Sequence, residues 1–121
     1  YDIIVNRLVM VAIPIVSGRF FESVFAMLKV PAKMQQLFFK GMEEEFNVPL
    51  EKMNLIKRKE KIKADKVILI YDEDDEVVSL SDIRHFLLVR PEVESYNAKG
   101  TGHNTIIRNK KVIDEVIRFL K

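Results

Sequence analysis

The sequence contains no cysteine among its 121 residues. This absence excludes a disulfide framework, a thiolate metal site and a cysteine nucleophile. It also fits a reducing compartment, and we therefore expect the protein to be cytoplasmic. No basic segment followed by an apolar stretch and a small-residue cleavage site stands near the first residue, so we expect no signal peptide.

Long hydrophobic runs are also lacking. The longest apolar stretch, residues 3–16, is interrupted by Asn6, Arg7 and Pro14, and it is too short and too polar to span a bilayer. The net charge is only +2, which is too small to indicate a nucleic-acid partner by itself. One charge run, residues 57–63, contains no aromatic residues and fits a solvated connector better than a phosphate-binding patch. We expect neither a membrane nor a nucleic-acid partner.

The remaining composition is typical of a soluble single domain covering residues 1–121, with 48% hydrophobic and 31% charged residues. Strand and helix patterns alternate, which predicts an α/β fold with about three parallel strands, right-handed crossovers and flanking helices. The expected elements are a strand at 7–13, helices at 21–28, 31–46 and 50–56, a strand at 66–71, a helix at 79–89, a strand at 93–98 and a helix at 105–120.

The first strand is apolar along nearly its whole length, so we expect it to be buried on both faces. Nothing earlier in the sequence is available to pair with its outer edge, and a bare apolar edge promotes association. One interpretation is a non-catalytic interaction module that homodimerises by antiparallel pairing of residues 7–13, with three strands from each copy in one sheet. The other is a complementing N-terminal half that pairs with the same strand.

The last third of the sequence places an acid and a histidine after two neighbouring strands. Asp75 follows the strand at 66–71, and His103 follows Gly100 and Gly102, whose flexibility allows a tight turn. Because ligands of open parallel sheets bind at the carboxyl ends of the strands, both loops should face one edge. A carboxylate on one imidazole nitrogen fixes the tautomer of a general base. Asp75 and His103 are therefore the candidate catalytic pair, with Asp74 as an alternative acid.

In these loops the chain resembles the α/β-hydrolase family. The family acid lies in a Gly-x-x-Asp-x-x-Val-Pro loop, here residues 72–79, and the family histidine lies in a Gly-x-Gly-His loop, here ending at His103. Residues 7–14 are similar to the strand after the nucleophile helix. Residues 17–56 resemble a helical cap, and residues 64–121 resemble the acid strand, helix, histidine loop and final helix.

The resemblance implies a partial α/β-hydrolase fold, the C-terminal part of an esterase-like serine hydrolase. Such an enzyme acts on a small-molecule ester or acyl substrate and needs no cofactor and no metal. Two residues depart from the family pattern, since Asp72 replaces a glycine and Ser79 replaces a proline. We expect both departures to leave the chemistry untouched.

The nucleophile of such an enzyme is absent from this sequence. None of the serines stands in the Gly-x-Ser-x-Gly elbow that exposes a nucleophile beside its oxyanion donor. We expect the elbow before Tyr1, and we expect the chain by itself to be inactive. The serines are Ser17, Ser23, Ser79, Ser81 and Ser95.

Other interpretations of the polar and apolar residues stay open. Asp72 and Asp74 follow a strand and could bind Mg²⁺, as in Toprim-type domains, although the first strand ends without the glutamate that such domains need. His85 is expected to be a surface or partly buried residue rather than a second base. A set of apolar residues at helical spacing fits a core better than an acyl pocket, namely Met27, Met34, Phe38, Phe39 and Met42.

Overall fold

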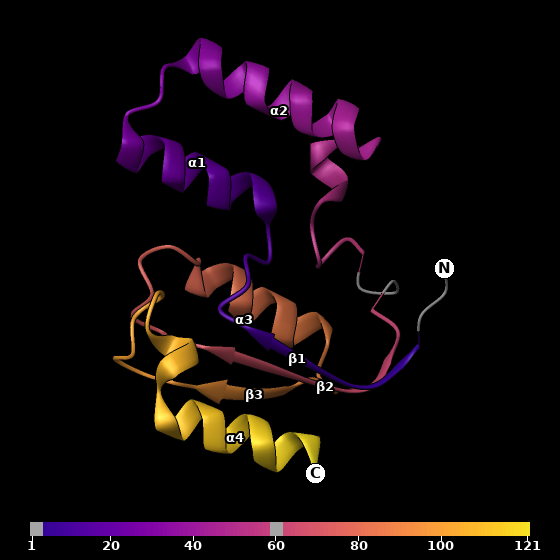
Figure 1. The fold of residues 1–121 in the computed structure, drawn as a ribbon. Coiled ribbons are helices and arrows are strands. Elements are labelled where there is room, and N and C mark those ends of the chain that lie inside the picture. Colours follow the sequence, from indigo (N-terminus) through magenta and orange to yellow (C-terminus); the bar gives the residue numbers. More distant parts are fainter. Residues whose placement is uncertain (1–3, 59–61) are drawn as a thin grey trace.

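The structure, a computed structural model, describes residues 4–58 and 62–121. Its centre is a sheet of three parallel strands in the order β1, β2, β3, with β1 at Val5–Val11, β2 at Ala64–Tyr71 and β3 at Glu94–Asn97. Helix α3, Leu80–Val89, covers one face of the sheet, and α4, Lys110–Leu120, covers the other (Figure 1). The parallel α/β sheet expected from the sequence is confirmed.

The central strand β2 supplies most of the core. Its residues 67–70 are fully buried, and alternate side chains contribute to two apolar clusters. Val67 and Leu69 pack with Ile83 and Phe86 of α3, while Ile68 and Ile70 pack on the opposite face. A continuous apolar run is what a parallel strand needs when helices cover both faces.

The expectation that the first strand is buried on both faces is wrong. In β1 only Met10 is buried, and most of its other residues are half-buried. The physical reason is its position, because β1 pairs with β2 on one side and, in the described part of the chain, with no strand on the other.

The helical segment between β1 and β2 forms an arm that stands off the sheet (Figure 1). It consists of α1, Ser17–Leu28, α2, Ala32–Phe46, and the short 3₁₀ helix η1, Leu50–Lys52, which is all that forms of the helix expected at 50–56. Phenylalanine rings join the two long helices, with centroids of Phe21 and Phe38 4.9 Å apart and those of Phe25 and Phe39 5.6 Å apart.

The apolar residues of this arm are only partly used in packing. Phe38 and Phe39 lie in the ring cluster and Met42 is half-buried, but Met27 and Met34 are exposed, so the core expected from them is wrong at these two positions. A pair of helices that touches the sheet mainly through its base has only one inner face to fill. No helix within residues 4–58 and 62–121 has the length and apolar character that crossing a bilayer requires.

The final helix begins five residues later than the sequence pattern predicts. A short 3₁₀ helix, η3 at Ile106–Arg108, comes first, and Asn109 then adopts an extended conformation. The Asn109 side chain accepts hydrogen bonds from the amides of Lys111, at 2.9 Å, and Val112, at 3.4 Å. Asparagine is a strong N-cap because it satisfies amides that lack partners in the first turn.

The inner face of α4 also differs from the one that the apolar spacing within residues 105–120 predicts. That spacing predicts a single stripe of Val112, Ile113, Val116, Ile117 and Leu120. Val112 and Phe119 are buried and Val116 is half-buried, whereas Ile113, Ile117 and Leu120 are exposed. Arg7 of β1 donates a hydrogen bond to the Phe119 carbonyl and lies over the Phe119 ring. The helix is thus rotated so that Phe119 points inward.

We expect Phe119→Ala to lower the free energy of unfolding by about 3 kcal/mol, because it empties a site that is 2% exposed. Leu120→Ala removes a side chain that is half exposed and should cost less than about 1 kcal/mol. Urea unfolding of both variants measures the difference. Equal losses would contradict the inward placement of Phe119 on α4.

Candidate active site

Asp75 and His103 meet at the carboxyl edge of the sheet. The loop after β2 carries Asp75, the loop after β3 carries His103, and 2.8 Å separates the Asp75 Oδ2 atom from the His103 Nδ1 atom. The Asp75 side chain is 1% exposed, while the His103 side chain is 26% exposed. The structure therefore brings the two predicted site residues together, with the acid covered and the imidazole partly open to solvent.

The Asp75 carboxylate is oriented by its own loop. Its Oδ1 atom accepts hydrogen bonds from the amides of Val77, at 2.7 Å, and Val78, at 3.0 Å, which leaves Oδ2 for His103. An ionised carboxylate only accepts hydrogen bonds, so the proton of this contact belongs to Nδ1 of the imidazole. The Nε2 atom of His103 then carries the lone pair and is the basic atom.

A second carboxylate, that of Asp72, joins the acid loop to the histidine loop. Asp72 directly follows β2 and is 1% exposed. Its Oδ1 atom accepts from the amides of Asp74, at 2.9 Å, and Gly100, at 3.1 Å. Its Oδ2 atom accepts from the Gly102 amide at 2.7 Å and the Thr101 hydroxyl at 3.4 Å. Residues next to both Asp75 and His103 are therefore tied to one carboxylate.

The pKa of Asp72 lies below its ordinary value. Burial by itself raises the pKa, but hydrogen bonds from the backbone amides of Asp74, Gly102 and Gly100 stabilise the charged form and lower the pKa further than burial raises it. Asp72 is thus held as a buried anion among N–H groups and the Thr101 hydroxyl.

The glycines of the histidine loop are required by its backbone. Gly100 has φ 76° and Gly102 has φ 73°, values that other residues adopt only with strain. In these conformations both amides point to Asp72. The tight turn expected from the two glycines is confirmed. Asp72 accepts the hydrogen bonds that the amides of this turn donate.

The expectation that Asp72 leaves the chemistry untouched stays a prediction, but the structure adds a contact that it did not include. The Asp72 carboxylate holds the backbone of the loop that carries His103. The sequence contained a signal for this role, since an aspartate directly after a buried strand needs hydrogen-bond partners. The sequence does not show that the partners are amides 28 and 30 residues away.

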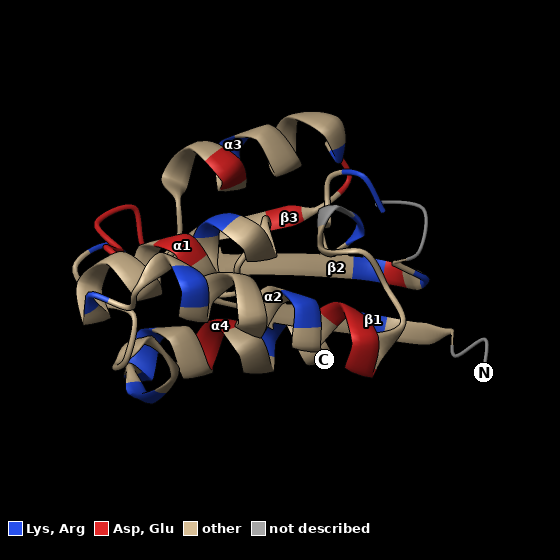
Figure 2. Ribbon diagram, turned by 90° about the horizontal axis from the view of Figure 1, so that it is seen from above, with Lys and Arg blue, Asp and Glu red and all other residues tan. Residues whose placement is uncertain are grey.

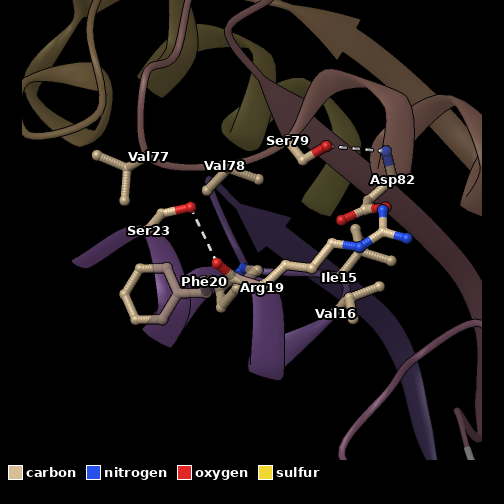
Figure 3. Close-up of a pocket in the computed structure, with 10 residues that line it drawn as sticks. Ile15, Val16, Arg19, Phe20, Ser23, Val77, Val78, Ser79 and Asp82 are labelled. Carbon is tan, nitrogen blue, oxygen red and sulfur yellow. Dashed lines mark hydrogen bonds and ion pairs between the residues drawn. The ribbon is translucent and has the colours of Figure 1, made fainter. Parts of the chain in front are cut away.

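A small pocket lies between the start of α1 and the end of the acid loop (Figure 3). Its volume of about 20 Å³ is enough for a single water molecule. Arg19 of α1 reaches across one side and forms an ion pair with the buried carboxylate of Asp82. Neither Asp75 nor His103 lines this pocket. It marks where the helical arm is fastened to α3 rather than a substrate site.

No serine in the described part of the chain is hydrogen bonded to His103. Ser23 donates to the Arg19 carbonyl, and Ser79 caps α3 and contacts the Ser81 hydroxyl. His85 is exposed on α3, as expected of a surface residue. The histidine loop therefore has its acid partner and, among these residues, no nucleophile.

The carboxylates after β2 are not arranged around a cation. Residues 4–58 and 62–121 contain no group of three His, Cys, Asp or Glu side chains that could hold a metal ion. Both oxygens of Asp72 are used by N–H and O–H donors.

The acidic loop stands out at one end of the sheet, whereas Lys and Arg are spread over several elements (Figure 2). The charge run expected as a connector lies partly outside the described residues, at 59–61.

No family model matches the chain, and no curated protein and no solved structure shows significant similarity to it.

The low pKa of Asp72 has a consequence for acid stability. The folded state binds this proton less readily than the unfolded state, so the contribution of Asp72 to stability is complete above the ordinary carboxyl pKa, about 3.9, and is lost as pH falls through the lower folded-state pKa. We expect Asp72→Asn to lower the free energy of unfolding by about 2 kcal/mol at neutral pH, because an amide side chain leaves N–H donors unsatisfied.

Chemical unfolding at several pH values measures this effect. The difference between wild type and Asp72→Asn should narrow as pH falls below about 4. Asp74→Asn, an exposed neighbour, is the matched control and should change stability by less than about 0.5 kcal/mol. A difference that stays constant with pH would contradict the role of the Asp72 charge.

Proposed function

We propose that this chain carries the acid and the general base of an α/β-hydrolase-type serine hydrolase and is the C-terminal part of that enzyme. The observation that supports the proposal is the contact of 2.8 Å between Asp75 Oδ2 and His103 Nδ1 at the carboxyl ends of adjacent parallel strands. The nucleophile comes from a segment outside these 121 residues. The substrate class is an ester or acyl compound with a carbonyl carbon open to attack.

In this mechanism Nε2 of His103 takes the proton of the serine hydroxyl as the hydroxyl oxygen attacks the substrate carbonyl. Asp75, covered from solvent, keeps the imidazole in the Nδ1–H tautomer and stabilises the imidazolium that forms. The imidazolium then gives its proton to the leaving alcohol. His103 activates water in the same way to release the acyl group.

The nucleophile-bearing segment has a surface on which to dock. Since the Val5 amide donates to the Lys63 carbonyl of the neighbouring chain segment, and peptide groups alternate along a strand, the amides and carbonyls of residues 6, 8 and 10 face outward from the edge of β1. The exposed side chains of Ile113, Ile117 and Leu120 lie on α4, the helix that Arg7 of β1 contacts at Phe119. Arg118 of the same helix pairs with Glu94 of β3, which is at the other edge of the sheet.

Activity tests the proposal. The chain alone should hydrolyse p-nitrophenyl acetate no faster than its His103→Ala variant, because a general base without a nucleophile and oxyanion donor gives little acceleration. The coding sequence upstream of Tyr1 should encode a Gly-x-Ser-x-Gly elbow. The longer chain should then react with a fluorophosphonate at its elbow serine.

In that longer chain, His103→Ala and Asp75→Asn should each slow the labelling by about 10³-fold or more. His85→Ala and Asp74→Asn are the matched controls and should leave the rate unchanged. The absence of an elbow upstream, or esterase activity of the chain alone above the His103→Ala baseline, would contradict the proposal.

The second candidate is an interaction module, and the open edge of β1 supports it. Arg7 is the one charged residue of β1, and its side chain contacts Phe119. No other charged side chain of this strand opposes pairing of its edge with a second strand. We expect the chain to self-associate through β1 and the exposed apolar side chains of α4. Ile117→Lys, at a position 45% exposed, and Asn6→Pro, which removes an outward amide, should each weaken association about tenfold, or about 1.4 kcal/mol.

Light scattering over a range of concentrations measures the association. Leu88→Lys alters a leucine that is 79% exposed on α3, and Asn6→Ala keeps the outward amide, so neither control should weaken it. A monomer at every concentration would rule out the homodimer. Association that is insensitive to both edge variants would place the contact elsewhere.

A further inference from the structure

The positions of Asp75 and His103 depend on two separate loops. One follows β2 and the other follows β3, so the strands fix only the residue at which each loop begins. The backbone joins them at the strand ends, where the Ala98 amide donates to the Tyr71 carbonyl at 2.7 Å. Beyond that point a further tie is needed, because a hydrogen-bonded pair requires placement within a fraction of an ångström.

Asp72 supplies ties on both sides of the pair. Its Oδ1 atom holds the amide of Asp74, one residue before Asp75, and its Oδ2 atom holds the amide of Gly102, one residue before His103. The Asp72 carbonyl also accepts from the Asp75 amide at 3.1 Å. The Glu73 amide also donates to the Asn97 side chain at 3.2 Å, and Glu73 forms an ion pair with Lys99, but both contacts are open to solvent. The Asp72 side chain is therefore the buried tie between the two loops.

We propose that Asp72 is a positioning residue for the His103 imidazole, acting through the amides of the acid loop and the histidine loop. This inference rests on the proposed function for its catalytic meaning, but its test needs no catalysis. Asp72 touches neither the imidazole nor any reacting atom. Its part is to hold His103 Nδ1 against Asp75 Oδ2, so that Nε2 is the atom presented to a nucleophile.

Asparagine at this position is a sharp test, because it keeps the shape of the side chain. The Oδ1 atom accepts from both loops, through the amides of Asp74 and Gly100, and the Oδ2 atom accepts from the histidine loop, through the Gly102 amide. Asparagine keeps one acceptor and turns an NH₂ group toward the donors of the other oxygen, so in either orientation an amide of the histidine loop loses its acceptor. The backbone tie at Tyr71 remains, so the histidine loop should stay attached but lose its placement.

The experiment is ¹H–¹⁵N NMR of the histidine side chains in the full chain at neutral pH. The wild-type protein should show a His103 Nδ1–H signal that exchanges slowly with water, as a bonded Nδ1–H tautomer requires. Asp72→Asn should lose this signal and shift His103 toward the Nε2–H tautomer. Gly102→Ala keeps the Asp72 carboxylate but places a Cβ at a backbone position with φ 73°. It should weaken the His103 signal by straining the amide that donates to Asp72.

Two controls separate positioning from stability. Asp74→Asn changes the neighbouring exposed carboxylate and should leave the signal intact. Phe119→Ala destabilises the fold through an apolar side chain of α4 that makes no hydrogen bond to either loop, and it should also leave the signal intact.

Retention of the signal in both Asp72→Asn and Gly102→Ala, or its equal loss in Phe119→Ala, would overturn the positioning role alone. A wild-type protein without the signal would overturn the Asp75–His103 pair as well, and with it the proposed function.

Discussion

The Asp72 carboxylate is the constraint on which the end of the sheet depends. It is buried where β2 ends, and it accepts hydrogen bonds from the loops that follow two different strands. A buried charge is tolerated only when donors surround it, so each loop is as necessary to Asp72 as Asp72 is to the loops. The contact between Asp75 and His103 depends on these hydrogen bonds. Asp75 follows Asp74 and His103 follows Gly102, and Asp72 accepts from the amides of Asp74 and Gly102.

The strand and helix layers make the arrangement possible. The buried residues 67–70 of β2 form the base, and the pairing of β3 with β2 brings residues far apart in the sequence to one edge. Gly100 and Gly102, both with positive φ, then direct their amides toward Asp72. The helical arm is tied to this core by the ion pair of Arg19 and Asp82, at the small pocket in Figure 3, and by the turn that leads into α1.

Much of this arrangement could be predicted from local patterns. The apolar run of β2, the amphipathic pattern of α3 and the order of acid and histidine all follow from side-chain periodicity and spacing, which act over a few residues. The errors lie where distant contacts decide. The burial of β1 depends on whether a strand lies beyond it, and the rotation of α4 depends on the place of Phe119 under the sheet rather than on the apolar stripe alone.

By itself the sequence determined the α/β order, the candidate pair Asp75 and His103 and the absence of a nucleophile elbow, because these depend on residue types and their order. Only the tertiary structure decided which carboxylate faces the imidazole and which holds the loops. Asp72, Asp74 and Asp75 are chemically identical, and their roles differ because one is buried among amides, one is exposed and one contacts Nδ1. The histidine loop, which supplies the amides around Asp72 and the imidazole beside Asp75, lies 28 to 30 positions further along the chain. No local sequence pattern contains contacts at that separation.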